Sequence, residues 1–142
     1  NSYSLINRIV ELGMTEIFFR EKLSFFSYSP LGFGHLSGKY LKNPKEAGRV
    51  NLFPGYAQRY NKSGVKKAIE KYDALAAKRN VSLTDLALSF VYSQWFVTST
   101  VIGATNMNQL KQNIAAYGLD IVDEELIQEI DAIHLHVMNP AP

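Results

Sequence analysis

The residues whose types and spacing are best suited to bind a ligand are glycines and a lysine that follow a short apolar segment. Gly32, Gly34 and Gly38 come soon after the run at residues 23–28, and Lys39 follows the last of them directly. Glycines behind a strand allow backbone N–H groups to approach an anion closely. The segment is therefore a candidate phosphate-binding loop.

Two well-known phosphate motifs do not fit this loop. A Walker loop requires glycine five positions before its Gly-Lys pair and Ser or Thr after it, but these positions hold Phe33 and Tyr40. The dinucleotide fingerprint requires its third glycine at position 37, which is Ser37. The phosphate interpretation thus depends on the backbone argument alone, and from these residues it stays open.

Positive charge gathers in the same part of the chain. Residues 39–67 hold eight basic residues and one acid, whereas residues 118–142 hold six acids and no Lys or Arg. The basic members are Lys39, Lys42, Lys45, Arg49, Arg59, Lys62, Lys66 and Lys67. Such a stretch can form an anion site, or it can be a solvated loop and helix face. The net charge of +2 is too small to indicate a nucleic-acid partner.

Several classes of site and location are disfavoured. The chain has no cysteine, which excludes disulfides and Cys-ligated metals and suits a reducing, cytoplasmic location. His35, His134 and His136 lack metal-ligand spacing, so we expect no metal site. The sequence contains no run of about 18 apolar residues, so we expect no membrane-spanning helix. Residues 1–4 lack the basic region of a signal peptide and resemble the middle of a strand.

The elements that must position the loop follow from periodicity. Short apolar or β-branched runs predict strands at residues 23–28 and 97–102, with a partial strand at 1–5. A helix is expected over 7–15. Apolar stripes predict four more helices, with N-caps at Ser82 and Asn106 and an acidic start at Asp123. The stripes are Val65, Ile69, Tyr72 and Ala76; Leu86, Ala87, Phe90 and Val91; Leu110, Ile114 and Tyr117; and Leu126, Ile127, Ile130 and Ile133.

The order of these elements predicts the fold class. Strands separated by helices indicate a parallel α/β arrangement. Two complete strands and one partial strand are too few for a stable parallel sheet, whose strands are normally buried on both faces. Residues 32–62 form a loop of unusual length, which is typically functional or mobile.

Three segments resemble the aldo-keto reductase family. Residues 28–40 (YSPLGFGHLSGKY) resemble the family's Y-S-P-L-x-x-G-x-L-[ST]-G-K-Y run. Residues 101–113 (VIGATNMNQLKQN) resemble its V-x-G-[AT]-[ST]-x-x-x-Q-L-x-x-N segment, and residues 82–91 resemble the helix before its last strand. The similarity covers essentially the whole chain. It is greatest to the branch that contains Tas-like proteins and the potassium-channel β-subunits.

The resemblance implies a (β/α)8 TIM barrel, of which residues 1–142 would supply the C-terminal portion, about strands six to eight and their helices. Barrels often bind phosphate after strands seven and eight. By position, Tyr28 would stack on the nicotinamide of NADP(H), and Lys39 and Arg49, ten residues apart here and in the family, would clamp phosphate. The other implied cofactor-binding residues are Ser29, Pro30 and Leu31 along the pyrophosphate, Gly103 and Thr105 at the 2′-phosphate end, and Gln109, Gln112 and Asn113 around the ribose phosphate and adenine.

Each of these roles has a simpler alternative. Tyr28 could be a rim aromatic, Gln109 could only cap its helix, and Asn113 could only bond the backbone. Many family members have Arg at the position of Gln109 and Glu at that of Gln112, so charge pairing with a 2′-phosphate is weaker here. Lys39, Arg49 and the helix N-terminus near residue 106 still favour NADP over NAD.

The implied activity is reduction of aldehydes or ketones to alcohols by hydride transfer. The family's catalytic Tyr, Lys, Asp and His surround a D-x-A-x-x-Y motif, which this sequence lacks, so we expect the isolated chain to be inactive. Alternatives are a cofactor-binding regulatory module of the channel β-subunit type and an inactive split-gene fragment. A barrel cut after strand five exposes a strand edge and an apolar interior. The missing N-terminal half or self-association is expected to cover it.

Overall fold

A computed structural model describes residues 1–53, 55 and 58–142. The chain begins with a bridge segment, a 3₁₀ turn η1 (Ile9–Leu12), helix α1 (Met14–Arg20) and strand β1 (Phe25–Tyr28). The long connection that follows holds η2 (Gly32–Ser37), α2 (Lys39–Lys42), α3 (Arg49–Leu52) and η3 (Gln58–Asn61). The remaining elements are α4 (Ser63–Lys78), α5 (Leu83–Tyr92), β2 (Val97–Val101), α6 (Met107–Ala115), η4 (Ala116–Gly118) and α7 (Glu124–His136).

The two strands are parallel neighbours. Phe26 pairs with Ser99, and Tyr28 pairs with Val101. Ser2 adds a parallel bridge on the other side of Tyr28, so the N-terminal segment lies beside β1 as a third, very short strand. The expected parallel α/β class is therefore confirmed, although the partial strand at residues 1–5 is reduced to this bridge.

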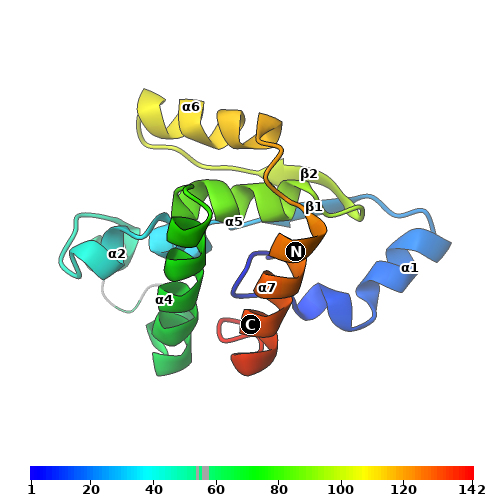
Figure 1. Cartoon of the computed structure of the whole chain (residues 1–142), viewed down its shortest axis with the longest axis horizontal. Helices are drawn as coiled ribbons and strands as arrows, with labels where there is room; N and C mark the ends of the chain where they lie inside the picture. Colours follow the sequence, from blue (N-terminus) through cyan, green and yellow to red (C-terminus); the bar gives the residue numbers. More distant parts are fainter. Residues whose placement is uncertain (54, 56–57) are drawn as a thin grey trace.

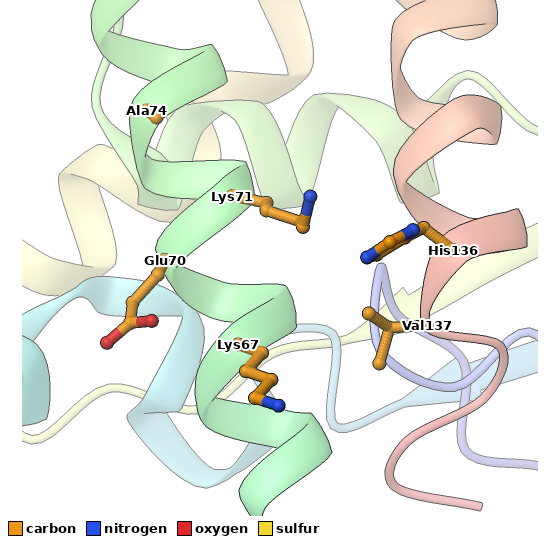
Figure 2. A pocket seen from close by; sticks show the side chains of 6 residues that line it. All are labelled: Lys67, Glu70, Lys71, Ala74, His136 and Val137. Atoms are coloured by element: carbon orange, nitrogen blue, oxygen red, sulfur yellow. The ribbon is translucent and has the colours of Figure 1, made fainter.

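The helices surround the sheet unevenly. In Figure 1, α5 runs across the middle of the molecule, with α6 on one side and α4 and α7 on the other, while α1 lies apart at the end opposite α2. Helices α4 and α7 pack together, and a shallow hollow remains between them, into which Lys67, Lys71 and His136 point (Figure 2). Among the described residues, no helix combines the length and apolarity needed to span a membrane.

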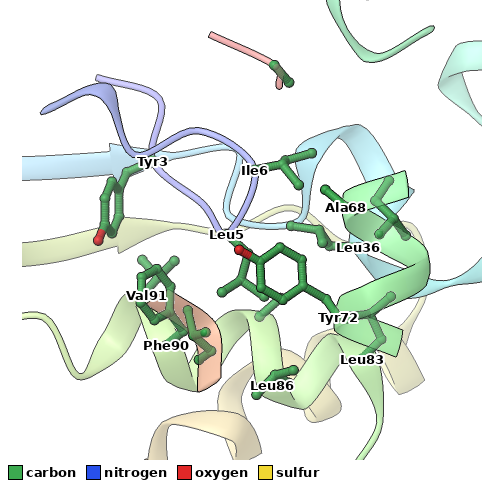
Figure 3. Close-up of a cluster of buried hydrophobic side chains, with 14 of the residues drawn as sticks. Tyr3, Leu5, Ile6, Leu36, Ala68, Tyr72, Leu83, Leu86, Phe90 and Val91 are labelled. Carbon is green, nitrogen blue, oxygen red and sulfur yellow. The ribbon is translucent and has the colours of Figure 1, made fainter. Parts of the chain in front are cut away.

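The core lies where α4, α5 and α7 meet the N-terminal segment. Tyr3, Leu5 and Ile6 are fully buried there, against side chains of α4 and α5 (Figure 3). The predicted stripes of α4 and α5 are buried as expected, and those of α7 face inward. The buried face of the helices is therefore the one that periodicity predicted.

One face of the sheet is not covered. In β1 the side chains of Phe25 and Ser27 are buried, whereas Phe26 and Tyr28 are exposed by 58% and 44%. Opposite them on β2, Ser99 and Val101 are also exposed. The predicted strand at residues 23–28 thus forms over residues 25–28 and is buried on one face only, because no described element packs on the other face.

Helix α6 departs from its predicted packing. Ile114 is exposed by 59%, Tyr117 lies beyond the helix in η4 and is exposed by 78%, and Asn113 is the buried residue of α6. The predicted helix over 7–15 is also wrong. It breaks at Gly13, whose φ of 142° is outside the helical region, so that η1 ends at Leu12 and α1 begins at Met14.

Candidate cofactor-binding site

The end of β1 turns sharply into the long connection. Tyr28 closes the strand, and Ser29 has a φ of 56°, a left-handed conformation that is uncommon for a residue with a Cβ atom. The N–H of Gly32 donates to the carbonyl of Ser29 at 2.9 Å, which closes the turn. Pro30 is buried and Leu31 is half-buried. Of this group, Tyr28 presents a substantially exposed ring, at the uncovered face of the sheet.

A kink follows inside η2. Phe33 and Gly34 have φ values of 57° and 90°, so the glycine at position 34 allows a backbone that other residues rarely adopt. At Gly32 the reason for glycine is also space, because an added Cβ would lie 3.0 Å from Ile6 Cδ1. These glycines therefore bend the connection tightly over the core.

The two predicted phosphate ligands begin two short helices. Lys39 is the first residue of α2, and its Nζ lies 3.4 Å from the carbonyl of Ala47 and 4.8 Å from the ring centre of Tyr40. Arg49 is the first residue of α3 and its guanidinium lies 5.5 Å from the ring centre of Phe33. Within the described part of the chain, neither forms an ion pair. Both charges are therefore held by neutral groups and available to an anion.

A third cation, which the sequence analysis did not select, joins them. The guanidinium of Arg59 lies 6.0 Å from the ring centre of Phe33 and 5.0 Å from that of Tyr60. Arg49 and Arg59 therefore share Phe33 as a neighbour. The basic stretch at residues 39–67 was the available signal, but the contact between segments ten residues apart was not visible in the sequence.

His35 lies beneath this loop. Its ring stacks on Tyr60 with the centres 5.3 Å apart and lies 5.0 Å from the ring of Tyr40. Burial lowers the pKa of His35, and the nearby charge of Lys39 lowers it further. Burial also raises the pKa of Tyr60. His35 is thus a neutral packing residue under the loop at neutral pH.

The end of β2 leads to a second group of predicted residues. The side-chain carbonyl of Gln109 accepts hydrogen bonds from the N–H of Thr105 at 2.9 Å and from its hydroxyl at 3.0 Å. The side chain of Asn106 accepts from the N–H of Gln109 at 3.0 Å, which confirms the predicted N-cap. Gln109 does not complete a capping box with Asn106, since its side chain bonds one residue earlier, at Thr105.

Gln112 and Asn113 are engaged elsewhere. The amide of Gln112 donates to Ser82 Oγ at 3.1 Å and to Asp85 Oδ1 at 3.2 Å, at the start of α5. Asn113 is buried and donates to the carbonyl of Gly103 at 3.2 Å. Asn113 thus makes a bond to the backbone, and its place around the adenine stays a prediction. The groups that face outward here are the turn and the first residues of α6, because residues 103–109 are all exposed.

The two groups lie toward the same end of the molecule. Because β1 and β2 are parallel, their C-terminal ends point the same way, and Figure 1 shows α2 and the start of α6 on that side. The donor set suits a dinucleotide phosphate chemically: Lys39 and Arg49, which have no acidic partner among the described residues, and an exposed helix N-terminus. The hollow of Figure 2 contains none of the predicted site residues, and lies between α4 and α7 instead.

Two tyrosines of the core carry hydroxyl groups that are enclosed by the protein. Tyr3 is fully buried and its hydroxyl donates to Glu11. Burial, with the adjacent Glu11 carboxylate, raises the pKa of Tyr3 well above its usual range. Tyr72 is also buried, and burial raises its pKa. Neither hydroxyl can reach a substrate oxygen from outside, so neither serves as a general acid.

Comparison with known proteins identifies the family. The sequence model of the Aldo/keto reductase family matches residues 1–134. Protein tas of Escherichia coli is 41% identical over all 142 residues, which cover 41% of its length. An aldo-keto reductase of Babesia bovis is 36% identical over a match that covers 97% of this chain and 51% of the relative's length. A probable voltage-gated potassium channel subunit beta of rice (Oryza sativa subsp. japonica) is 29% identical over a match that covers 94% of this chain and 46% of the relative's length.

The matched lengths show how much of each relative corresponds to this chain. The 142 residues span roughly two fifths to one half of these relatives. The family implies a (β/α)8 barrel for the complete domain, and the two parallel strands described here, with their bridge, do not close one. The motif resemblance is confirmed, and the chain belongs to the aldo/keto reductase family.

Proposed function

We propose that this chain carries the NADP(H)-binding part of an oxidoreductase that reduces aldehydes or ketones to alcohols. The observation that carries the proposal is the placement of Lys39 and Arg49 on one connection after β1, without acidic partners among the described residues. Family membership supplies the reaction class, since aldo-keto reductases generally use NAD(P)H. As for position in the barrel, residues 1–142 correspond in this proposal to about strands six to eight.

The predicted site residues other than Gln112 each have a task in this proposal. Tyr28 offers its exposed ring as a stacking platform, while the Ser29–Leu31 turn lines the pyrophosphate. Lys39 and Arg49 neutralise phosphate charge, and the turn from Gly103 to Thr105 with the start of α6 receives the adenosine end. The bound cofactor would supply hydride for the substrate carbonyl. Gln109 and Asn113 act through the turn, because their side chains hold Thr105 and Gly103.

The proposed preference for NADP over NAD depends on positively charged side chains and not on side-chain amides. Gln112 donates to Ser82 and Asp85, so it is already engaged by the protein. A 2′-phosphate adds negative charge, which Lys39, Arg49 and the N-terminus of α6 favour. Arg59, which shares Phe33 with Arg49, adds a further positive charge to this end of the molecule.

The proton donor for the carbonyl is assigned outside these residues. Acid catalysis requires a donor within hydrogen-bond reach of the substrate oxygen, and the buried Tyr3 and Tyr72 do not meet that requirement. The Tyr, Lys, Asp and His of the reaction would come from the remaining β/α units. The same units, or a second copy of the chain, would cover the exposed sheet face at Phe26 and Val101.

A titration of the purified 142-residue chain with NADPH tests the proposal, with intrinsic fluorescence as the signal. Saturable binding is expected, and Lys39→Ala or Arg49→Ala should weaken it about tenfold each, as for loss of one charged hydrogen bond. NADH should bind less tightly than NADPH. Lys67→Ala is the matched control, because Lys67 lies in the hollow between α4 and α7. A folded chain that does not bind NADPH, or an equal loss in the Lys67 variant, would contradict the proposal.

A second candidate function is favoured by one comparison. The rice relative is a probable channel subunit, and it matches 94% of this chain. In that case cofactor binding would regulate a partner and turnover would be secondary. Co-purification of the complete protein with a channel, without carbonyl reductase activity, would support this candidate over the enzyme. An inactive split-gene product would bind neither NADPH nor a partner.

A further inference from the structure

The side chain of Lys39 is confined on two sides. On one side its stem approaches Gly34, where an added Cβ would lie 3.1 Å from Lys39 Cε and 3.6 Å from Nζ. On the other side Nζ reaches the segment at Ala47 and Gly48, with the carbonyl of Ala47 at 3.4 Å. The ring of Tyr40 lies 4.8 Å from the same ammonium. The lysine therefore passes between two glycines that are fourteen residues apart.

Gly48 makes the closest of these approaches. A methyl group at this position would overlap the hydroxyl of Tyr40 and would lie 2.5 Å from Lys39 Nζ and 3.2 Å from its Cε. Real Cβ atoms essentially never come within 3.0 Å of such neighbours. Any residue other than glycine would therefore displace Lys39 or Tyr40.

The backbone gives no reason for glycine at this position. Gly48 has φ 175° and ψ 170°, which is extended backbone open to any residue. This distinguishes it from Gly34 and Gly38, whose φ values of 90° and 73° by themselves favour glycine. The space that Gly48 leaves is thus its particular contribution, and that space is occupied by the hydroxyl of Tyr40 and the ammonium of Lys39.

We propose that Gly48 is a positioning residue, which holds the Lys39 ammonium against the start of α3 so that Lys39 and Arg49 address one phosphate group. The inference rests on the proposed NADP(H)-binding function for its biological purpose, but the placement of Lys39 can be tested without any nucleotide. A lysine stem packed between two glycines loses less rotamer freedom when it binds phosphate, since it is already ordered.

The first test measures the reactivity of the Lys39 amine. The chain is treated briefly with an acetylating succinimidyl ester, and modification of Lys39 and of the exposed Lys42 is compared by mass spectrometry. Lys39 should react more slowly than Lys42 by roughly two- to fivefold, as expected for an ammonium held on an aromatic ring. Gly48→Ala should remove that difference. Gly118→Ala is the control, because an added Cβ there meets nothing within 4 Å. Equal reactivity of Lys39 in the wild-type chain and in Gly48→Ala would overturn the proposal.

The second test is a double-mutant cycle, which remains informative if Gly48→Ala destabilises the chain. The urea midpoint is measured for Gly48→Ala alone and in the Lys39→Ala background. The shift caused by Gly48→Ala should be smaller without Lys39, because residues in contact are not additive. Equal shifts in both backgrounds would mean that Gly48 and Lys39 do not interact, and the proposal would fail.

NADPH affinity separates this inference from the proposed function. If the wild-type chain binds NADPH, Gly48→Ala should weaken binding in the presence of Lys39 and leave it unchanged in the Lys39→Ala background. If the wild-type chain does not bind, the proposed function fails, while the acetylation result still decides whether Gly48 positions Lys39. If binding is weakened equally in both backgrounds, the positioning role is wrong and the cofactor site stands.

Discussion

The side-chain amide of Asn113 donates a hydrogen bond to the carbonyl of Gly103 at 3.2 Å, and this contact ties α6 to the turn after β2. Asn113 is the buried residue of α6 and is 3% exposed. The bond matters because Gly103 and Thr105 begin the exposed turn that we assign to the adenosine end of the cofactor. Asn113 therefore supports the site from behind.

Replacement of Asn113 tests this supporting role. Asn113→Ala leaves the Gly103 carbonyl without its partner, and the free energy of unfolding should fall by about 1–2 kcal/mol. Urea unfolding followed by circular dichroism provides the measurement. Gln112→Ala is the matched control, since Gln112 is exposed and bonds exposed groups. The assignment is wrong if the two variants have the same midpoint.

Arg8 fastens the N-terminal segment to α7. Its guanidinium pairs with Glu11 and Asp131, both at 2.7 Å, and its side chain is only 11% exposed. Burial opposes the charge, but the hydrogen bonds that Arg8 donates to Glu11 and Asp131 outweigh it and raise the pKa of Arg8. Arg8→Met should destabilise the chain by about 3 kcal/mol, because both carboxylates lose a part-buried partner.

The matched control for Arg8 is Arg20, whose pair with Glu16 has exposed side chains on both sides. Arg20→Met should change the free energy of unfolding by less than about 0.5 kcal/mol. Thermal unfolding at low ionic strength measures both variants. A similar loss for Arg8 and Arg20 would show that the Arg8 network contributes little.

Stability should depend on pH through two histidines. Burial, with Lys39 nearby, lowers the pKa of His35, and burial, with Arg8 nearby, lowers the pKa of His134. In the unfolded chain each takes up its proton near pH 6.5, the ordinary value, whereas the folded chain does so only at lower pH. The unfolded state therefore binds more protons in that window, and stability should fall as pH drops below about 6.5.

His35→Phe keeps an aromatic ring against Tyr60 and removes the titrating group. The slope of unfolding free energy against pH between about 6.5 and 5 should become shallower. The comparison is made by urea unfolding at several pH values, with the same variant at pH 8 as its own reference. An unchanged slope in both His35→Phe and His134→Leu would rule out this linkage.

The uncovered sheet face should make the isolated chain self-associate. Phe26 and Val101 are each 58% exposed and lie on the face formed by β1 and β2. Contiguous exposed apolar surface of this kind marks an interaction site. Phe26→Ser should reduce association in sedimentation velocity and reduce binding of an apolar dye. Leu135→Ser is the control on α7, where Leu135 is 70% exposed. A monomeric wild-type chain without dye binding would contradict the expectation of an open barrel face.

The sequence by itself determined the elements whose signals are local. Ser82 was predicted as an N-cap, and its hydroxyl accepts the N–H of Asp85 at 3.1 Å. Asp123 caps α7 in the same way. The stripes of α4, α5 and α7 were also correct, since a helix that packs on one face must repeat its apolar residues with the helical period. The family was identified from motifs that occur in the expected order and at the expected spacing, and neither property requires knowledge of tertiary contacts.

Only the tertiary structure decided which predicted side chains remain outward-facing. The resemblance of residues 101–113 predicts Gln112 and Asn113 around the cofactor, and only the structure shows that one bonds the start of α5 and the other bonds Gly103. The stripe of α6 had correct spacing, yet Ile114 is exposed because no described element covers it. Likewise, the space that Gly48 leaves for Lys39 depends on a loop folding back on itself. Hydrogen-bond partners and burial join residues distant along the chain, so spacing alone cannot reveal them.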